Sequence, residues 1–206
     1  MRENRRVSVS GTAAYDGRED LPPLVAKAVA AARESGFGQS CLPEHGLLLR
    51  LLAGGVGAGV IGETGTGCGV GLAWLASGAA ADARLVSVER DQARVAKAGQ
   101  VFAGEPRVEL IEGDWRELKA MAPFDLLVLD GGGQGKGEEP PLDPEEWLRP
   151  GGLVVLDDFT PMREWPPMHA GVPDAARLYW LEHPRLRAAE VRVTPEWASI
   201  IATFVG

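Results

Sequence analysis

The sequence has few of the features that mark secreted, membrane-spanning or disulfide-stabilised proteins. It contains only two cysteines, Cys41 and Cys68, in 206 residues, too few for a disulfide framework and suited to a reducing compartment. The apolar segment 47–53 is much too short to cross a membrane and is interrupted by Arg50. The charged start, residues 1–6, is not followed by an apolar run, so no secretory signal is expected. We therefore expect a cytoplasmic protein with no membrane partner.

Positive charge is also scarce. The chain carries 21 Lys and Arg against 29 Asp and Glu, which gives a formal net charge of −8. Its only basic cluster is formed by Arg2, Arg5 and Arg6. Because contacts with phosphates require a basic surface, nucleic acid is not expected as a substrate or partner. A small molecule is the expected substrate.

The chain alternates between apolar runs and helical segments. Residues 21–35 and 43–53 have the pattern of helices, and strands and helices then alternate from Val60 to Asp158. This alternation predicts an α/β fold with a mostly parallel sheet and helices on both faces. The β-rich runs 186–194 and 198–205 have no helix between them, so the chain is expected to end in a hairpin.

The length and the hydrophobic content of 45% favour a single domain. We expect it to cover residues 19–206, with N-terminal helices at 19–56 and a ligand-binding core at 57–206. Two segments are expected to be flexible: the polar N-terminus, residues 1–18, and the glycine-rich segment 131–141.

A glycine-rich segment lies between two expected strands. Gly65, Gly67 and Gly69 follow the first strand and precede a helix, so the backbone can turn there and approach a ligand at the helix N-terminus. Glu89 ends the next strand, 20 residues beyond Gly69. An acidic residue at this distance binds ribose hydroxyls in nucleotide-binding βαβ units. The segment therefore predicts a site for a nucleoside cofactor.

A dinucleotide does not fit this segment well. The pattern Gly-x-Gly-x-x-Gly fails when it is started at Gly65 or Gly67, and its match at residues 57–62 enters a strand instead of opening a helix. Glu63, inside the loop, is poorly suited to a pyrophosphate and well suited to a cationic ligand.

The segment from Glu63 to Gly69 (ETGTGCG) resembles motif I of the class I S-adenosylmethionine-dependent methyltransferases. Further segments resemble later parts of that family in the right order: 113–115 (GDW), 123–130 (PFDLLVLD) and 147–158 (WLRPGGLVVLDD). The resemblance covers residues 40–206. It implies a doubly wound, seven-stranded, mostly parallel sheet with a C-terminal reversed β-hairpin, and S-adenosylmethionine as cofactor. The implied cofactor-binding residues are Glu63, Gly65, Thr66, Gly67, Gly69, Glu89, Arg90, Gly113, Asp114, Trp115 and Asp130.

Three aspartates follow the ends of expected neighbouring strands. Asp130 follows one strand, and Asp157 and Asp158 end the next, so the three should meet at the ligand-binding edge of the sheet. Their hard oxygen ligands suit Mg²⁺ or another divalent cation. The arrangement resembles the small metal-dependent O-methyltransferases of the catechol and caffeoyl-coenzyme-A type, which carry Asp-Asn where this chain has Asp157-Asp158. That resemblance implies methylation of a catechol-like acceptor with two vicinal oxygens.

Two positions depart from that group. Gly133 stands where the group has a lysine that acts as general base, and Gly71 stands where it often has a serine. The catalytic candidates are therefore Asp130 and the bound metal, Lys136 on the glycine-rich loop, and His169 in the segment 159–172, which we expect to form a lid over the substrate. His45, at the start of an apolar helix, is expected to play a structural part.

The departures leave two alternatives open. One is a metal-independent methyltransferase acting on another small metabolite, and the other is a cofactor-binding homologue without catalytic activity. The resemblance also implies a homodimer, with the N-terminal helices and the edge of the C-terminal hairpin as the available pairing surfaces.

Overall fold

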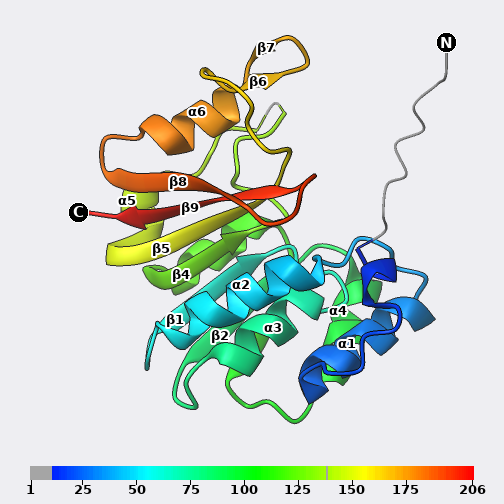
Figure 1. Cartoon of the computed structure of the whole chain (residues 1–206). Coiled ribbons are helices and arrows are strands. Elements are labelled where there is room, and N and C mark those ends of the chain that lie inside the picture. Colours follow the sequence, from blue (N-terminus) through cyan, green and yellow to red (C-terminus); the bar gives the residue numbers. More distant parts are fainter. Residues whose placement is uncertain (1–10, 138) are drawn as a thin grey trace, which may run out of the picture.

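The computed structural model describes residues 11–137 and 139–206. A sheet of seven strands forms its centre, in the order β3-β2-β1-β4-β5-β9-β8 (Figure 1). In chain order the elements are η1 (Ala13–Tyr15), α1 (Pro23–Glu34), α2 (Pro43–Gly54), β1 (Val60–Thr64), α3 (Val70–Gly78), β2 (Arg84–Glu89), α4 (Gln92–Phe102), β3 (Val108–Glu112), η2 (Trp115–Met121), β4 (Phe124–Leu129), α5 (Pro144–Trp147), β5 (Leu148–Phe159), β6 (Met168–His169), β7 (Val172–Pro173), α6 (Ala175–Glu182), β8 (Leu186–Arg192) and β9 (Ala198–Phe204).

The expected sheet is confirmed. Strands β1 to β5 pair in parallel, whereas β9 is antiparallel to β5, and β8 is antiparallel to β9. The last two strands form the reversed hairpin that the sequence predicts. In the part of the chain that the structure describes, no helix has both the length and the apolar character needed to cross a bilayer.

Both faces of the sheet are covered, and β4 shows why its sequence is continuously apolar. Its side chains alternate, so Leu126 and Val128 pack into the core on the α1–α4 face, and Leu127 and Leu129 pack into the core below α5 and α6. Figure 1 shows α1, α2 and α3 gathered on one side of the sheet and α6 on the other. A central parallel strand buried on both faces requires this composition. The helical cover leaves the carboxyl ends of the strands as the place for a ligand.

The N-terminal segment is better ordered than expected. Residues 1–18 are predicted to be flexible; residues 11–18 nevertheless include buried, hydrogen-bonded side chains, and residues 1–10 lie outside the described part of the chain. Tyr15 is 1% exposed, and its hydroxyl accepts a hydrogen bond from Trp74 Nε1 at 2.8 Å and donates to the Cys41 carbonyl at 3.0 Å. The hydroxyl of Thr12 donates to the Phe37 carbonyl at 2.6 Å. The polar composition of this segment gives no indication that Tyr15 and Thr12 make these hydrogen bonds.

Tyr15→Phe tests whether this anchor contributes to stability. The change removes one hydroxyl and leaves the Trp74 N–H and the Cys41 carbonyl without that partner, which should lower the free energy of unfolding by about 1–3 kcal/mol. Urea denaturation of the variant and the parent measures the difference. Equal midpoints and slopes for the two proteins would contradict the anchoring role of Tyr15.

The glycine-rich segment after β4 is also held in place. Residues 131–141, which the sequence predicts to be flexible, make specific hydrogen bonds where the structure describes them. Gln134 is buried, and its side-chain amide donates to the backbone carbonyl of Leu129. The backbone carbonyl of Gln134 accepts a hydrogen bond from Trp180 Nε1 at 2.8 Å. The Leu142 N–H donates to the Gly133 carbonyl at 3.0 Å. These bonds fix the segment beside the ends of β4 and β5.

Candidate functional site

A cavity of about 340 Å³ lies at the carboxyl ends of β1 to β4. Ten of the eleven residues expected to bind the cofactor line it, from Glu63 on β1 to Asp130 after β4. The exception is Gly69, which precedes α3 with a φ of 90° and lets that helix begin under the loop. The structure therefore brings the predicted cofactor residues together around one space. Phe37, Gln39, Ser40 and Cys41, which the sequence did not identify, close its other side.

Glu63 lies at the bottom of this cavity and is almost completely buried. Its Oε2 accepts a hydrogen bond from Ser87 Oγ at 2.7 Å, and Ser87 Oγ lies 2.6 Å from Thr66 Oγ1. Burial raises the pKa of the Glu63 carboxyl to about 8, although the Ser87 hydrogen bond opposes that rise. A Cβ atom on Gly71 would lie 2.5 Å from Glu63 Oε1. A serine at this position would therefore require the end of the Glu63 side chain to shift.

Glu89, at the end of β2, is held by the backbone of the glycine-rich loop. Its Oε2 accepts from the Gly67 N–H at 2.9 Å, and its Oε1 accepts from the Asp91 N–H at 3.0 Å. Glu89 is 5% exposed and lines the cavity, next to Arg90. The carboxylate is thus oriented at the rim where the sequence predicts a ribose.

The turn after β3 forms the opposite wall. Asp114 precedes η2 in a capping box with Glu117, and hydrogen bonding to the Arg116 backbone lowers the pKa of Asp114. The indole of Trp115 donates to Glu139 Oε1 at 2.7 Å. The start of η2 and the segment after β4 are therefore joined beside the cavity.

A second cavity, of about 480 Å³, adjoins the first. The two share five lining residues: Gln39, Ser40, Cys41, Asp130 and Asp158. The second cavity is completed by Asp157 on β5 and by residues from the N-terminal and C-terminal parts of the chain: Gly11, Gly38, Leu42, His45, Val193 and Trp197. A cofactor in the first cavity would therefore border directly on a molecule in the second.

The three aspartates predicted to bind a metal all border the second cavity. Burial raises the pKa of Asp130 well above its usual range, and the nearby Asp157 and Asp158 raise it further. Burial and Asp157 likewise raise the pKa of Asp158. Across residues 11–137 and 139–206, no three His, Cys, Asp or Glu side chains converge into a ready ligand set. The donor chemistry and the mutual repulsion of the aspartates nevertheless suit a hard divalent cation.

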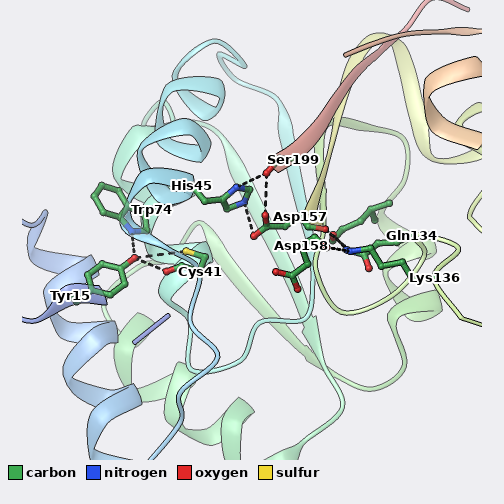
Figure 2. Close-up of polar contacts among 10 residues, drawn as sticks. Tyr15, Cys41, His45, Trp74, Gln134, Lys136, Asp157, Asp158 and Ser199 are labelled. Carbon is green, nitrogen blue, oxygen red and sulfur yellow. Dashed lines mark hydrogen bonds and ion pairs between the residues drawn. The ribbon is translucent and has the colours of Figure 1, made fainter. Parts of the chain in front are cut away.

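A bulge in β5 separates the side chains of Asp157 and Asp158. The pairing with β9 shifts between Leu156 and Phe159, and Asp158 has a positive φ of 65°. Bulges of this kind change the direction of side chains beside binding sites. Figure 2 shows the result: Asp157 points toward His45 and Ser199, whereas the Asp158 carboxylate points away from them.

The two other catalytic candidates do not line either cavity. Lys136 Nζ donates to the backbone carbonyls of Asp157 at 2.6 Å and Asp158 at 3.1 Å, and lies 4.2 Å from the centroid of the Phe159 ring. Burial lowers the pKa of Lys136. Figure 2 shows it on the opposite side of β5 from His45. His169 lies in the exposed hairpin of β6 and β7. None of the residues 159–172, the segment predicted to form a lid, lines either cavity.

The structure gives a reason for the glycine at position 133. Its φ is 81°, and a Cβ atom there would lie 3.1 Å from the Leu142 side chain and 3.2 Å from that of Trp115. A lysine would be strained in this conformation and crowded by both neighbours.

Comparisons with known proteins identify relatives of this chain. A family model described as a methyltransferase domain matches residues 63–159. A protein of Mycobacterium tuberculosis (strain ATCC 25618 / H37Rv) named a probable O-methyltransferase is 32% identical over 189 residues, which cover 84% of this chain and 78% of that protein. A relative from Mycobacterium sp. (strain JLS), also named as an O-methyltransferase, is 37% identical over 141 residues, 62% of each chain.

Solved structures share the fold. The O-methyltransferase TomG from Streptomyces achromogenes, involved in tomaymycin synthesis and crystallised with S-adenosylmethionine, matches over 100% of both chains with a TM-score of 0.69 and 21% identity.

Proposed function

This chain belongs to the family of class I S-adenosylmethionine-dependent O-methyltransferases, and we propose that it methylates an oxygen of a small, catechol-like acceptor with two vicinal oxygens. The observation that carries the proposal is the pair of adjoining cavities, with Asp130 and Asp158 in their common wall. A methyl donor and an acceptor must lie in line and in contact, and two cavities with a shared wall support that placement.

The first cavity is proposed to hold the cofactor. Glu63 lies below the motif I loop and would be negatively charged when a cationic cofactor is bound, Glu89 is oriented for the two ribose hydroxyls, and Asp114 lies in the turn beside the adenine position. Arg90 and Trp115 complete this wall. These residues bind and orient the cofactor, and none of them needs to form a covalent bond.

In the proposed reaction, an acceptor oxygen attacks the methyl carbon as the bond from that carbon to sulfur breaks. The chain has three tasks: it holds the two molecules in line, excludes water, and helps the acceptor hydroxyl lose its proton. A Mg²⁺ ion held by Asp130, Asp157 and Asp158 would supply positive charge that lowers the proton affinity of that hydroxyl. We propose these three residues as its ligands. Lys136 and His169 are less favoured as the base, because neither borders a cavity.

The charge of the second cavity restricts the acceptor. Three aspartates border it, and none of the described residues that line it is a lysine or an arginine. Trp197, Leu42 and Val193 supply an aromatic and apolar wall. This lining supports a neutral or cationic aromatic acceptor and disfavours an anionic one such as a coenzyme A thioester, which would lack a partner for its phosphates.

Cofactor binding provides the first test. S-adenosylhomocysteine should raise the melting temperature of the protein, and NAD should not. Glu89→Ala should weaken S-adenosylhomocysteine binding by about 1.5–3 kcal/mol, the size of a lost pair of charge-assisted hydrogen bonds. Isothermal titration calorimetry measures the affinity. Glu112→Ala is the matched control, because Glu112 ends the neighbouring strand β3 and does not line the cavity.

Turnover provides the second test, with catechol and a caffeoyl-coenzyme-A acceptor compared by mass spectrometry for gain of a methyl group. Methylation of the coenzyme A thioester alone would contradict the proposed acceptor class, and stabilisation by NAD would contradict the cofactor. The homodimer and the cytoplasmic location stay predictions.

A further inference from the structure

Glu139, in the segment after β4, lines the first cavity, although the sequence did not identify it as a cofactor residue. Its Oε1 accepts two hydrogen bonds from the residues after β3, one from Trp115 Nε1 at 2.7 Å and one from Arg116 Nη2 at 2.6 Å. The Glu139 side chain is 32% exposed, so it lies at the rim of the cavity and not in the protein core. One carboxylate oxygen therefore ties two neighbouring side chains to this rim.

Arg116 strengthens the connection. Its Nη1 donates to Asp114 Oδ1 at 2.9 Å, while its Nη2 donates to Glu139. Its guanidinium carbon lies over the Trp115 ring, 4.6 Å from the ring centroid, a distance at which a cation is attracted to an indole. The carboxylates of Asp114 and Glu139 thus hold the guanidinium against the indole.

The indole of Trp115 also packs on the backbone of two glycines. A Cβ atom on Gly132 would lie 2.3 Å from Trp115 Cδ1, and a Cβ atom on Gly133 would lie 3.2 Å from Trp115 Cζ3. The indole therefore occupies space that side chains at these two positions would otherwise fill. Its one polar atom, Nε1, is bound by Glu139.

The purine of the proposed cofactor should lie at this end of the cavity. Its sulfur must face the acceptor, across the common wall that contains Asp130 and Asp158. The ribose is expected at Glu89, and the base extends from the ribose away from the sulfur. Trp115 and Glu139 line the first cavity but not the second, as residues at the purine end should. An aromatic side chain offers a surface on which a purine can stack.

We propose that Glu139 is a positioning residue of the cofactor site, which holds the Trp115 indole in the orientation in which it binds the purine of S-adenosylmethionine. A side chain that is already fixed loses little rotamer freedom when the cofactor binds, and such preorganisation raises affinity. This inference rests on the proposed cofactor. It concerns the purine end alone and depends on neither the acceptor nor a metal ion.

Isothermal titration calorimetry with S-adenosylhomocysteine tests the inference. Glu139→Ala should weaken binding by about fivefold, the size of one lost hydrogen bond at a partly exposed site. 5′-Methylthioadenosine keeps the purine and the ribose but lacks the amino-acid part, and it should show the same fold-loss. Glu139→Gln keeps an oxygen that can accept from the indole, and it should bind S-adenosylhomocysteine within about twofold of the parent.

Two further variants separate positioning from a general effect on the fold. In a Trp115→Phe background, adding Glu139→Ala should cause no further loss, because Glu139 acts through the indole N–H. Glu146→Ala is the matched control and should bind S-adenosylhomocysteine like the parent. It removes an ion pair of 2.5 Å between Lys119 on η2 and Glu146 on α5, and neither residue lines a cavity.

The outcomes distinguish this inference from the proposed cofactor. Equal S-adenosylhomocysteine affinity of the parent and Glu139→Ala would overturn the inference and leave the cofactor site standing. So would a Glu139→Gln variant as weak as Glu139→Ala, an undiminished loss in the Trp115→Phe background, or a loss that is absent with 5′-methylthioadenosine. A parent protein that does not bind S-adenosylhomocysteine would overturn the cofactor itself, and this inference with it.

Discussion

Removal of divalent cations with EDTA is expected to abolish methylation of a catechol acceptor, and added Mg²⁺ is expected to restore it. Without a cation, burial raises the pKa of Asp130 well above its usual range, and the nearby Asp157 and Asp158 raise it further. Asp130→Ala and Asp157→Ala should each reduce kcat by at least about 100-fold, which corresponds to about 2.7 kcal/mol of lost transition-state stabilisation. The rate of S-adenosylhomocysteine formation at saturating substrates measures this loss.

Lys136 supplies the comparison. Lys136→Met keeps the apolar stem against Phe159 and removes only the ammonium that binds the carbonyls of Asp157 and Asp158. Its loss of kcat should be much smaller than that of either aspartate variant. An enzyme that is insensitive to the chelator, or a Lys136→Met variant as inactive as Asp157→Ala, would move the protein to the metal-independent alternative. Cofactor binding without turnover of any acceptor would favour the homologue without catalytic activity.

The stability of the ligand-free protein is expected to fall as the pH rises from about 5 to 8, and Glu63 is expected to cause much of this fall. Its pKa in the folded protein is about 8, far above the usual value for a glutamate. The unfolded chain therefore loses this proton at a lower pH than the folded chain does. The contribution of Glu63 to the stability of the folded protein is complete below the pKa that this carboxyl has in the unfolded chain. It is lost as the pH rises through the pKa that the carboxyl has in the folded protein.

The size of the effect follows from the shift. The rise of the Glu63 pKa from an ordinary 4.5 to about 8 sets an upper bound of about 4–5 kcal/mol on the loss of unfolding free energy, at about 1.36 kcal/mol for each pKa unit. Glu63→Gln keeps the side-chain volume and an acceptor for Ser87 but cannot ionise. It should flatten the pH dependence and raise the melting temperature at pH 8 by about 2–4 °C for each kcal/mol gained.

Differential scanning fluorimetry of the parent and variant from pH 5 to 9 tests this, with Glu164→Gln, a change at an exposed glutamate, as the control. Parallel curves for the parent and Glu63→Gln would contradict the role of Glu63. Because the cofactor is cationic, its binding should favour the ionised carboxyl. The affinity of the parent for S-adenosylmethionine should therefore rise between pH 6 and 8, and that of Glu63→Gln should not.

The fold could be predicted because its signals are local. The apolar run ending at Asp130 identifies a central strand, and the spacing from Gly69 to Glu89 identifies a βαβ unit that binds a nucleoside. The cofactor side of the site follows from the same segments, since Glu63, Glu89 and Asp114 each lie at or just after the end of a strand. Topology alone brings such residues to one edge of the sheet.

The acceptor side could not be predicted in the same way. His45 and Ser199 are 154 residues apart, and each looks like an ordinary buried residue in its own segment. Their contacts with Asp157 depend on the bulge at Asp157 and Asp158, which the apolar pattern of β5 does not reveal. The polar segment before α1 likewise gave no sign that Tyr15 would be buried. Long-range contacts that involve only one or two side chains leave no periodic pattern in a sequence.

The two cavities draw on different stretches of the chain, and this has a consequence for how new specificities arise. Most of the cofactor cavity comes from residues 63–139, whereas the residues that line the acceptor cavity alone come mainly from 11–45 and 193–197, near the two ends. Changes confined to the ends can therefore alter which molecule is methylated while the methyl donor stays the same. A chimaera with both end segments exchanged together for those of a relative should inherit that relative's acceptor preference, and exchange of one end alone should not.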